Sequence, residues 1–171
     1  MSKVIKKVLA IDPGTREMGF AFLEDGKPIY YGVKIIKKGR FPHEALNEGR
    51  KIVLRLIRDC KPNILVYEKS FFYNNRSAAL LNSLVDEIKL IGKRKGLEVR
   101  GFAPNTVKKA ICGYGRASKK EVARVMVSKY PELKVFLTQD RAWKEEYHQN
   151  MFDAIAIGVT SFHSCTLNAN R

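Results

Sequence analysis

The sequence predicts an α/β fold in which a mixed five-stranded sheet carries helices on both faces. Five short apolar runs have the length and composition of strands, and segments with helical periodicity separate the later runs. The first three runs follow one another without a helix between them, which indicates antiparallel pairing in that part of the sheet. The 171 residues suffice for one substantial core, so we expect a single domain over residues 1–171.

The chain is predicted to open with strands. The apolar run Val8–Ile11 is typical of a buried strand, and it ends at Asp12 because the Pro-Gly pair that follows favours a turn. Residues 18–36 are typical of two further strands, and the residues at 24–26 place the turn of an antiparallel hairpin between them. Asp12 is therefore expected at the carboxyl end of a strand.

Helices and strands alternate after the hairpin. Apolar residues recur at helical spacing over 44–60, until a Lys-Pro pair ends the segment. The next predicted elements are a strand over 64–67 that ends at Glu68, a helix with its apolar face over 81–91, a strand over 97–102 and a short helix around Lys108. Glu68, like Asp12, is thus expected where a buried strand ends.

The last part of the chain contains a basic loop and two more helices. The loop covers 113–117, and a capping box at 118–121 begins the helix that follows it. Residues 131–147 show no clear period. The final helix is expected to begin near Asn150; because it is apolar on most sides it should be buried, with Asp153 as its single acid.

The composition is strongly basic. Thirty-two Lys and Arg residues stand against 17 Asp and Glu, which gives a formal net charge of +15 and a pI near 9.9. A nucleic acid is the expected partner, and a generally solvated basic surface is the alternative. The three cysteines are odd in number, widely spaced and free of any C-x-x-C pair, so we expect neither disulfides nor a zinc site. No run of about 18 apolar residues occurs, so we expect no membrane contact and a cytoplasmic protein.

Three acids fall in segments that are predicted to be buried, namely Asp12, Glu68 and Asp153. Capping of a turn or a helix explains each of them taken alone. Together, at two strand ends and on a helix against the same sheet, they would repel one another unless a divalent cation joined them. Carboxylates suit Mg²⁺ or Mn²⁺, and two ions about 3.5 to 4 Å apart can activate water and stabilise the leaving oxygen of a phosphodiester. This cluster on a basic chain predicts a nuclease.

Five motifs follow one another along the chain. Ile-Asp-Pro-Gly-Thr at 11–15 is followed by Met-Gly-Phe-Ala at 18–21. The others are Tyr-Glu-Lys-Ser-Phe at 67–71, Ala-Pro at 103–104 with Val-Lys at 107–108, Gly-x-Gly-x-Ala-x-Lys at 113–119 and Asp-Ala-Ile-Ala-Ile at 153–157. In this order and spacing they resemble the RuvC family of Holliday junction resolvases, and the resemblance covers roughly residues 7–162.

The resemblance implies a ribonuclease-H-like fold and a homodimer that binds a four-way DNA junction. It implies the activity of a crossover junction endodeoxyribonuclease, which nicks two strands of like polarity symmetrically and leaves 5′-phosphate ends. By position, Asp12, Glu68 and Asp153 correspond to ligands of two Mg²⁺ ions, and Lys108 and Lys119 to lysines that support cleavage near the scissile phosphate. Without the resemblance, both lysines are ordinary solvated charges. A branch-migration helicase is a candidate partner, and the nucleoid is the expected location.

The resemblance also implies a set of DNA contacts. Phe71 corresponds to an aromatic residue that stacks on a base at the junction centre, and Phe72 and Tyr73 can share or replace that role. The alternative is that one of the two phenylalanines points into the core, since adjacent residues usually face opposite ways. The basic residues expected at the DNA are Arg76, Lys108, Lys109, Arg116, Lys119 and Lys120.

Asn150 is the main departure from the family pattern, in which Asp or His provides a fourth metal-directed group. Three explanations are open: Asn150 is a weaker ligand, His148 replaces the missing group, or the chain carries an Asp-to-Asn change that disables catalysis. A catalytically silent junction-binding protein is therefore one competing function. The other is a nuclease of the same fold that acts on RNA, of the ribosomal RNA processing type.

Overall fold

The structure is a computed structural model that describes residues 5–37, 39, 41–69, 76–137 and 142–168. In this part of the chain five strands form one sheet in the order β3-β2-β1-β4-β5. The strands are β1 (Lys7–Asp12), β2 (Glu17–Glu24), β3 (Lys27–Ile35), β4 (Ile64–Glu68) and β5 (Glu98–Phe102). β2 pairs antiparallel with β1 and β3, and β4 pairs parallel with β1 and β5. The predicted mixed sheet is confirmed.

The hairpin between β2 and β3 turns at Asp25 and Gly26, inside the predicted range. Both residues have positive φ angles, 45° and 87°, which is the conformation of the two-residue turns that match the twist of paired strands. The backbone N–H of Lys6 donates to Asp25 Oδ1 over 3.0 Å, and that of Asp25 donates to the Lys6 carbonyl over 2.9 Å. These bonds fix the hairpin against the start of β1, at the end of the sheet opposite to Asp12.

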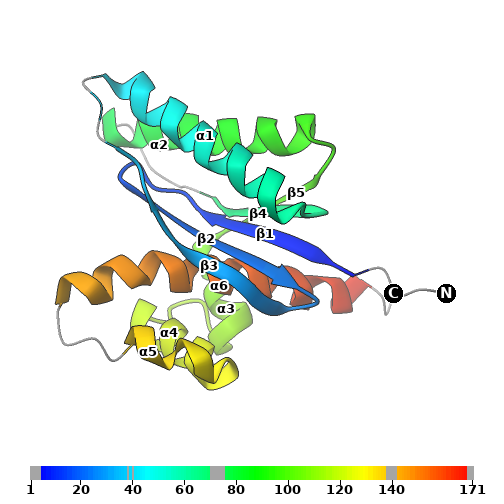
Figure 1. Cartoon of the computed structure of the whole chain (residues 1–171). Coiled ribbons are helices and arrows are strands. Elements are labelled where there is room, and N and C mark those ends of the chain that lie inside the picture. Colours follow the sequence, from blue (N-terminus) through cyan, green and yellow to red (C-terminus); the bar gives the residue numbers. More distant parts are fainter. Residues whose placement is uncertain (1–4, 38, 40, 70–75, 138–141, 169–171) are drawn as a thin grey trace.

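Helices cover both faces of the sheet, as predicted (Figure 1). α1 (Pro42–Cys60) and α2 (Arg76–Arg94) lie on one face, and α3 (Pro104–Cys112), α4 (Lys119–Lys129) and α6 (Ala142–Asn168) lie on the other. The short η1 (Pro131–Leu133) and α5 (Lys134–Leu137) follow α4. No helix among the described residues is long and apolar enough to cross a bilayer.

Alternate residues of β1 enter two separate cores. Leu9 and Ile11 pack in the core that Val53 of α1 and Ile88 of α2 share. Val8 and Ala10 pack in the core that contains the buried residues of α6. This alternation is the two-residue period of a strand, and it sets the direction in which the next residue, Asp12, points.

The final helix begins earlier than predicted. We expected its start near Asn150, whereas α6 begins at Ala142, and the region 131–147 contains η1, α5 and the first turns of α6. The stretch from Ala142 contains Ala, Lys, Glu and Gln, which favour helices without an apolar period. Apolar periodicity indicates that one face of a helix is buried. The first turns of α6 lack this periodicity, so it did not predict where the helix begins.

Two glycines let α6 lie close to the sheet. A Cβ atom on Gly19 of β2 would be 2.0 Å from the backbone oxygen of Asn150, and one on Gly158 would be 2.3 Å from a methyl carbon of Leu23. Any larger residue at Gly19 would force the helix and the strand apart, because the obstructing atom is backbone. This close approach places the polar turn of α6 beside the carboxyl end of β1.

Candidate active site

Asp12 and Glu68 lie at the ends of two neighbouring parallel strands. Ile11 of β1 is in register with Tyr67 of β4, so the acids that follow them stand side by side. Two residues earlier, Ala10 and Val66 both belong to the core beneath α6. Because side chains two residues apart share a face of a strand, Asp12 and Glu68 both point towards α6. The strand-end positions predicted for both acids are confirmed.

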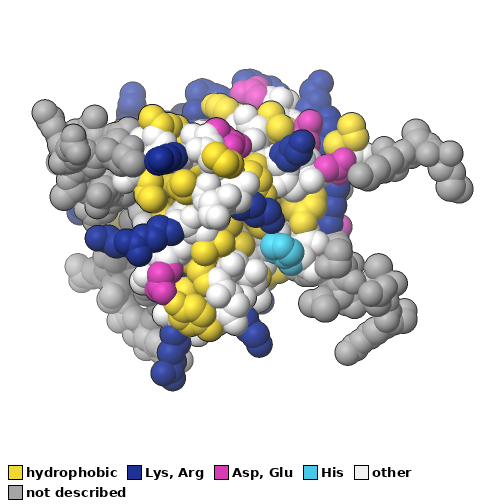
Figure 2. Space-filling view, turned by 90° about the horizontal axis from the view of Figure 1, so that it is seen from below, with side chains coloured by type: hydrophobic (Ala, Val, Ile, Leu, Met, Phe, Trp, Pro, Cys, Tyr) yellow, Lys and Arg dark blue, Asp and Glu magenta, His cyan; other side chains and the backbone are white. Residues whose placement is uncertain are grey.

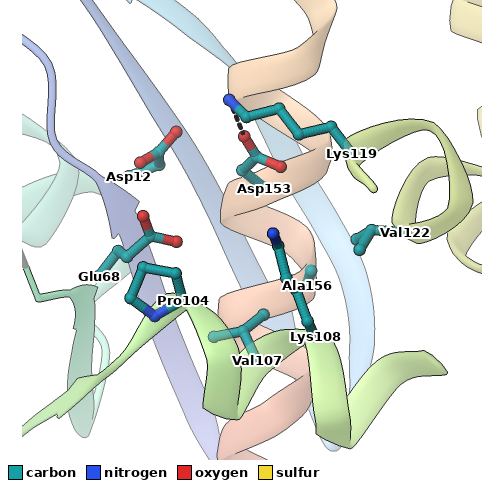
Figure 3. A pocket seen from close by; sticks show the side chains of 9 residues that line it. All are labelled: Asp12, Glu68, Pro104, Val107, Lys108, Lys119, Val122, Asp153 and Ala156. Atoms are coloured by element: carbon teal, nitrogen blue, oxygen red, sulfur yellow. Dashed lines mark ion pairs between the residues drawn. The ribbon is translucent and has the colours of Figure 1, made fainter. Parts of the chain in front are cut away.

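Asp153 meets these two acids from the side of the helix. Its neighbours Phe152, Ala154, Ile155 and Ala156 are buried, and only 15% of its own side chain is exposed. Figure 3 shows the carboxylates of Asp12 and Glu68 directed from the sheet towards Asp153 on α6. The three acids share a cavity of about 150 Å³, whose lining residues are Asp12, Glu68, Pro104, Val107, Lys108, Lys119, Val122, Asp153 and Ala156.

Both carboxylate oxygens of Asp153 have protein partners. Gln149 Nε2 donates to Oδ1 over 2.9 Å, and Lys119 Nζ lies 3.1 Å from Oδ2. Gln149 precedes Asp153 by four residues, so it lies on the same face of α6, one turn away. The Asp153 carboxylate is therefore held in one orientation from two sides.

Two lysines reach the cavity from the helices next to α6. Lys108 lies in the middle of α3, and Lys119 is the first residue of α4. The start of α4 is fixed by the predicted capping box, in which Ser118 Oγ accepts from the backbone N–H of Glu121 and the Glu121 carboxylate accepts from that of Ser118. The structure thus brings all five predicted catalytic residues to one cavity.

The electrostatics of the cavity follow from burial and mutual repulsion. The pKa of Asp12 is raised well above its ordinary value, mainly by burial and then by the negative charges of Asp153 and Glu68. Burial and Asp153 raise the pKa of Glu68 to about 7, against the opposing effect of Lys119 and Lys108. Although burial acts to lower the pKa of Lys119, the three acids, with Asp153 first, raise it. The site therefore has a deficit of positive charge that the ammonium groups of Lys119 and Lys108 reduce only in part.

The donor set fits a hard divalent cation. Carboxylate oxygens are the preferred protein ligands of Mg²⁺ and Mn²⁺, and a cation would relieve the repulsion that raises the pKa values of Asp12 and Glu68. Within the described residues, no three His, Cys, Asp or Glu side chains form a group that could hold an ion by themselves. Further ligands must then come from water or substrate, as is usual for Mg²⁺.

The two other predicted metal-directed residues do not line the cavity. Asn150 lies one turn before Asp153, and its Nδ2 donates to Glu17 Oε2 over 3.2 Å. The ring of His148 packs edge-on against Phe136 of α5, with 5.0 Å between the ring centroids. The structure therefore directs Asn150 towards β2 and His148 towards α5.

The predicted DNA contacts are only partly described. Phe71, Phe72 and Tyr73 lie outside the described residues, and so does the side chain of Arg76, whose backbone begins α2. The remaining residues outside the cavity, Lys109, Arg116 and Lys120, are exposed on α3, on the loop after it and on α4. Figure 2 shows this side of the molecule, on which Lys and Arg side chains project between apolar patches and acids are fewer.

Sequence reasoning missed two polar residues around the site and part of the role of a third. Gln149 could have been found, because a residue four positions before a buried acid of a helix lies on the same face. Glu17 carried no such signal, since its partner Asn150 is 133 positions away. Glu121 was assigned only to the capping box, yet its carboxylate also accepts a hydrogen bond from the Tyr114 hydroxyl in the basic loop.

Known proteins resemble this chain over most of its length. The model of the family Crossover junction endodeoxyribonuclease RuvC matches residues 8–161. The protein of that name from Fusobacterium nucleatum is 29% identical over 163 residues, covering 92% of this chain and 80% of the relative. The one from Rickettsia bellii is 30% identical over 158 residues, covering 90% and 94%.

A solved structure has the same fold. RuvC of Thermus thermophilus in complex with a Holliday junction substrate has a TM-score of 0.72 at 21% identity, over 94% of this chain and 96% of that chain. This likeness confirms the predicted ribonuclease-H-like fold. The family match, in turn, extends from β1 to α6 and includes every residue that brings charge to the cavity. The chain belongs to the RuvC family of crossover junction endodeoxyribonucleases.

Proposed function

We propose that this chain is a structure-selective endonuclease that resolves four-way DNA junctions by paired, symmetrical nicks and leaves 5′-phosphate ends. One observation carries the proposal: three carboxylates and two lysines of a RuvC-family chain converge on a single cavity. The formal net charge of +15 supports a polyanionic substrate.

The chain's own residues have distinct tasks in this proposal. RuvC proteins are metal-dependent nucleases, and two Mg²⁺ ions, which Mn²⁺ can replace, would activate the attacking water and stabilise the leaving oxygen. Asp12, Glu68 and Asp153 would hold the ions, and the hydrogen bond from Gln149 keeps Asp153 oriented. Lys108 and Lys119 would bind the scissile phosphate and offset the charge that develops on it.

A homodimer is part of the same proposal. A four-way junction has approximate twofold symmetry, and two nicks at equivalent positions require two equivalent active sites. The Thermus thermophilus relative was solved with a Holliday junction substrate, which supports a branched DNA as the ligand. Phosphate contacts should supply most of the affinity, and the shape of the branch point should supply the selectivity.

The experiment that tests the function is cleavage of a synthetic four-way junction by the full chain. Linear duplex DNA and RNA serve as control substrates, and Mg²⁺, Mn²⁺ and EDTA are compared. Asp12→Asn is the matched inactive variant, because it keeps the size of a residue in the cavity while it removes the charge.

We expect symmetrical, metal-dependent nicks near the branch point, and junction binding without cleavage by Asp12→Asn. Degradation of RNA with no cleavage of junctions would show that the substrate is wrong. Junction binding without cleavage by the unchanged chain in both metals would identify a silent binding protein. Full cleavage by Asp12→Asn would overturn the assignment of the site.

A further inference from the structure

Tyr114 occupies the connection between α3 and α4, the two helices that carry Lys108 and Lys119 to the cavity. α3 ends at Gly113, whose φ of 87° is a left-handed conformation that reverses the chain. The next residue, Tyr114, is followed within five positions by the first turn of α4. It is therefore an aromatic residue in the loop that adjoins the candidate active site.

The hydroxyl group of Tyr114 is already used within the protein. It donates to Glu121 Oε1, while Glu121 Oε2 accepts from both the backbone N–H and the hydroxyl of Ser118, at 2.7 Å each. The hydrogen bonds from Tyr114 and then from Ser118 lower the pKa of Glu121 to about 2, so this carboxylate stays ionised at neutral pH. The tether joins Tyr114 to the helix turn that carries Lys119.

The aromatic ring of Tyr114, in contrast, is available to a ligand. The residue is 47% exposed, although a tyrosine ring is largely apolar. Exposed basic residues lie on both sides of it in the sequence, namely Lys109, Arg116 and Lys120. An apolar protein partner does not suit such a charged surface, whereas DNA offers phosphates for the basic groups and base faces for the ring.

We propose that Tyr114 is a stacking platform for an unpaired DNA base next to the branch point. The proposal rests on the proposed function, and it adds a base contact to a loop in which Arg116 is exposed and can bind a phosphate. The tether to Glu121 fixes the ring before DNA arrives, so little side-chain entropy is lost when a base stacks on it. Stacking accepts any base, so this contact selects unpaired nucleotides rather than a sequence.

The test uses four-way junctions that carry a fluorescent adenine analogue at single positions around the branch point. Stacking on an aromatic ring quenches this analogue. We would compare the unchanged chain with Tyr114→Phe, Tyr114→Leu and Tyr114→Ala, each in EDTA to prevent cleavage, and measure both the quenching and the dissociation constant. Tyr30→Ala is the matched control, because Tyr30 is 45% exposed on the edge strand β3 and lies level with Leu9, away from the cavity.

We expect one position to be quenched by the unchanged chain and by Tyr114→Phe, which keeps the ring and loses the tether. Tyr114→Leu and Tyr114→Ala should lose this quenching and bind the junction about tenfold more weakly. Another aromatic residue that stacks on DNA would quench equally in all variants, so the difference between Phe and Leu isolates Tyr114. Tyr30→Ala should resemble the unchanged chain.

Two results would overturn the proposal while the proposed function stands. One is equal quenching and binding by the unchanged chain and all three Tyr114 variants. The other is a loss in Tyr114→Phe as large as that in Tyr114→Ala, because the residue would then act through its hydroxyl as a support for the loop. Failure of the unchanged chain to bind junctions at all would instead refute the proposed function, and the Tyr114 proposal with it.

Discussion

Lys119 Nζ lies 3.1 Å from Asp153 Oδ2, and this ion pair joins the first residue of α4 to the buried face of α6. The two side chains differ in how tightly the protein holds them. Only 15% of the Asp153 side chain is exposed, and Gln149 holds its other oxygen, whereas 64% of the Lys119 side chain is exposed. Asp153 is the fixed partner, so a phosphate that enters the cavity can draw Lys119 towards itself without disturbing the acid.

This relationship predicts that Lys119→Met lowers cleavage far more than binding. The variant keeps much of the length of the side chain but removes the charge next to Asp153, so the transition state loses a positive partner. We expect the single-turnover rate of junction cleavage to fall about 10²- to 10³-fold, as for other charge-stabilising groups. The dissociation constant should change by only about threefold, because one contact among many phosphate contacts is lost.

Lys120→Met is the matched control for Lys119→Met. Lys120 is the next residue of α4, it is exposed, and it does not line the cavity. Its loss should weaken binding slightly and leave the cleavage rate of the bound junction unchanged. Equal losses of rate and affinity in Lys119→Met would refute its role in cleavage.

The stability of the metal-free protein should fall as the pH rises. The pKa of Glu68 in the folded protein is about 7, above its ordinary value of 4.5, so the folded state favours the protonated form. The stability that this preference contributes is fully present below about pH 4.5 and is lost as the pH rises through about 7, on the order of 2 to 3 kcal/mol. The raised pKa of Asp12 acts in the same direction.

Thermal unfolding in EDTA between about pH 5.5 and pH 8.5 measures this effect. Glu68→Gln removes the titrating group and should flatten the pH dependence. A free energy of unfolding for the unchanged chain that stays constant or increases over this range would contradict the repulsion described for the three acids.

Asp12→Asn should increase the stability of the metal-free protein and abolish its response to Mg²⁺. The amide keeps the shape of the buried side chain and removes one of three repelling charges. In EDTA near neutral pH, we expect the free energy of unfolding to increase by about 1 to 3 kcal/mol. Mg²⁺ should stabilise the unchanged chain by mass action but not the variant. A lower melting temperature for Asp12→Asn in EDTA would show that Asp12 is stabilising as a carboxylate.

Asn150→Asp should destabilise the protein because it places a second carboxylate about where Nδ2 now donates to Glu17. We expect a loss of about 1 kcal/mol, typical of a lost hydrogen bond with added repulsion at a partly buried site. Glu17→Gln combined with Asn150→Asp restores one donor and one acceptor, so the double variant should recover most of the loss. Urea unfolding of the unchanged chain, the two single variants and the double variant gives the coupling energy between Asn150 and Glu17. If the two changes in the free energy of unfolding are simply additive, the contact between these residues is refuted.

Gly19→Ala should impair both folding and cleavage. Its Cβ atom would meet the backbone oxygen of Asn150 at 2.0 Å, so α6 must move away from β2 and carry Asp153 with it. We expect a loss of about 1 to 3 kcal/mol, as for other overpacked sites, and a cleavage rate reduced even where the protein is fully folded. Gly96→Ala provides a comparison, because Gly96 lies between α2 and β5, and a Cβ atom there meets no atom within 4 Å and is strained only by the positive φ. If the two folded variants cleave at the same rate, Gly19 is not needed to hold Asp153 in its catalytic position.

The sequence by itself determined most of the sheet and three of the acids in the site. Asp12 and Glu68 each follow a short apolar run that must be a buried strand, and Asp153 is the single acid on the apolar part of the last helix. Acids in such places are costly unless they are compensated, which is why they stand out in the sequence alone. The turn at 24–26 and the capping box at Ser118 could also be predicted from the sequence, because each depends only on residues that are close together in the chain.

Only the tertiary structure decided which side chains meet. The hydrogen bond from Asn150 to Glu17 joins residues 133 positions apart, the ring of His148 packs against α5, and α6 begins at Ala142 rather than near Asn150. These features depend on how closely α6 approaches the sheet. Gly19 permits this close approach, but a glycine in a strand does not by itself predict which helix will pack against it. Local propensity and periodicity report what a segment buries, whereas a contact between distant segments depends on the packing of all the elements between them.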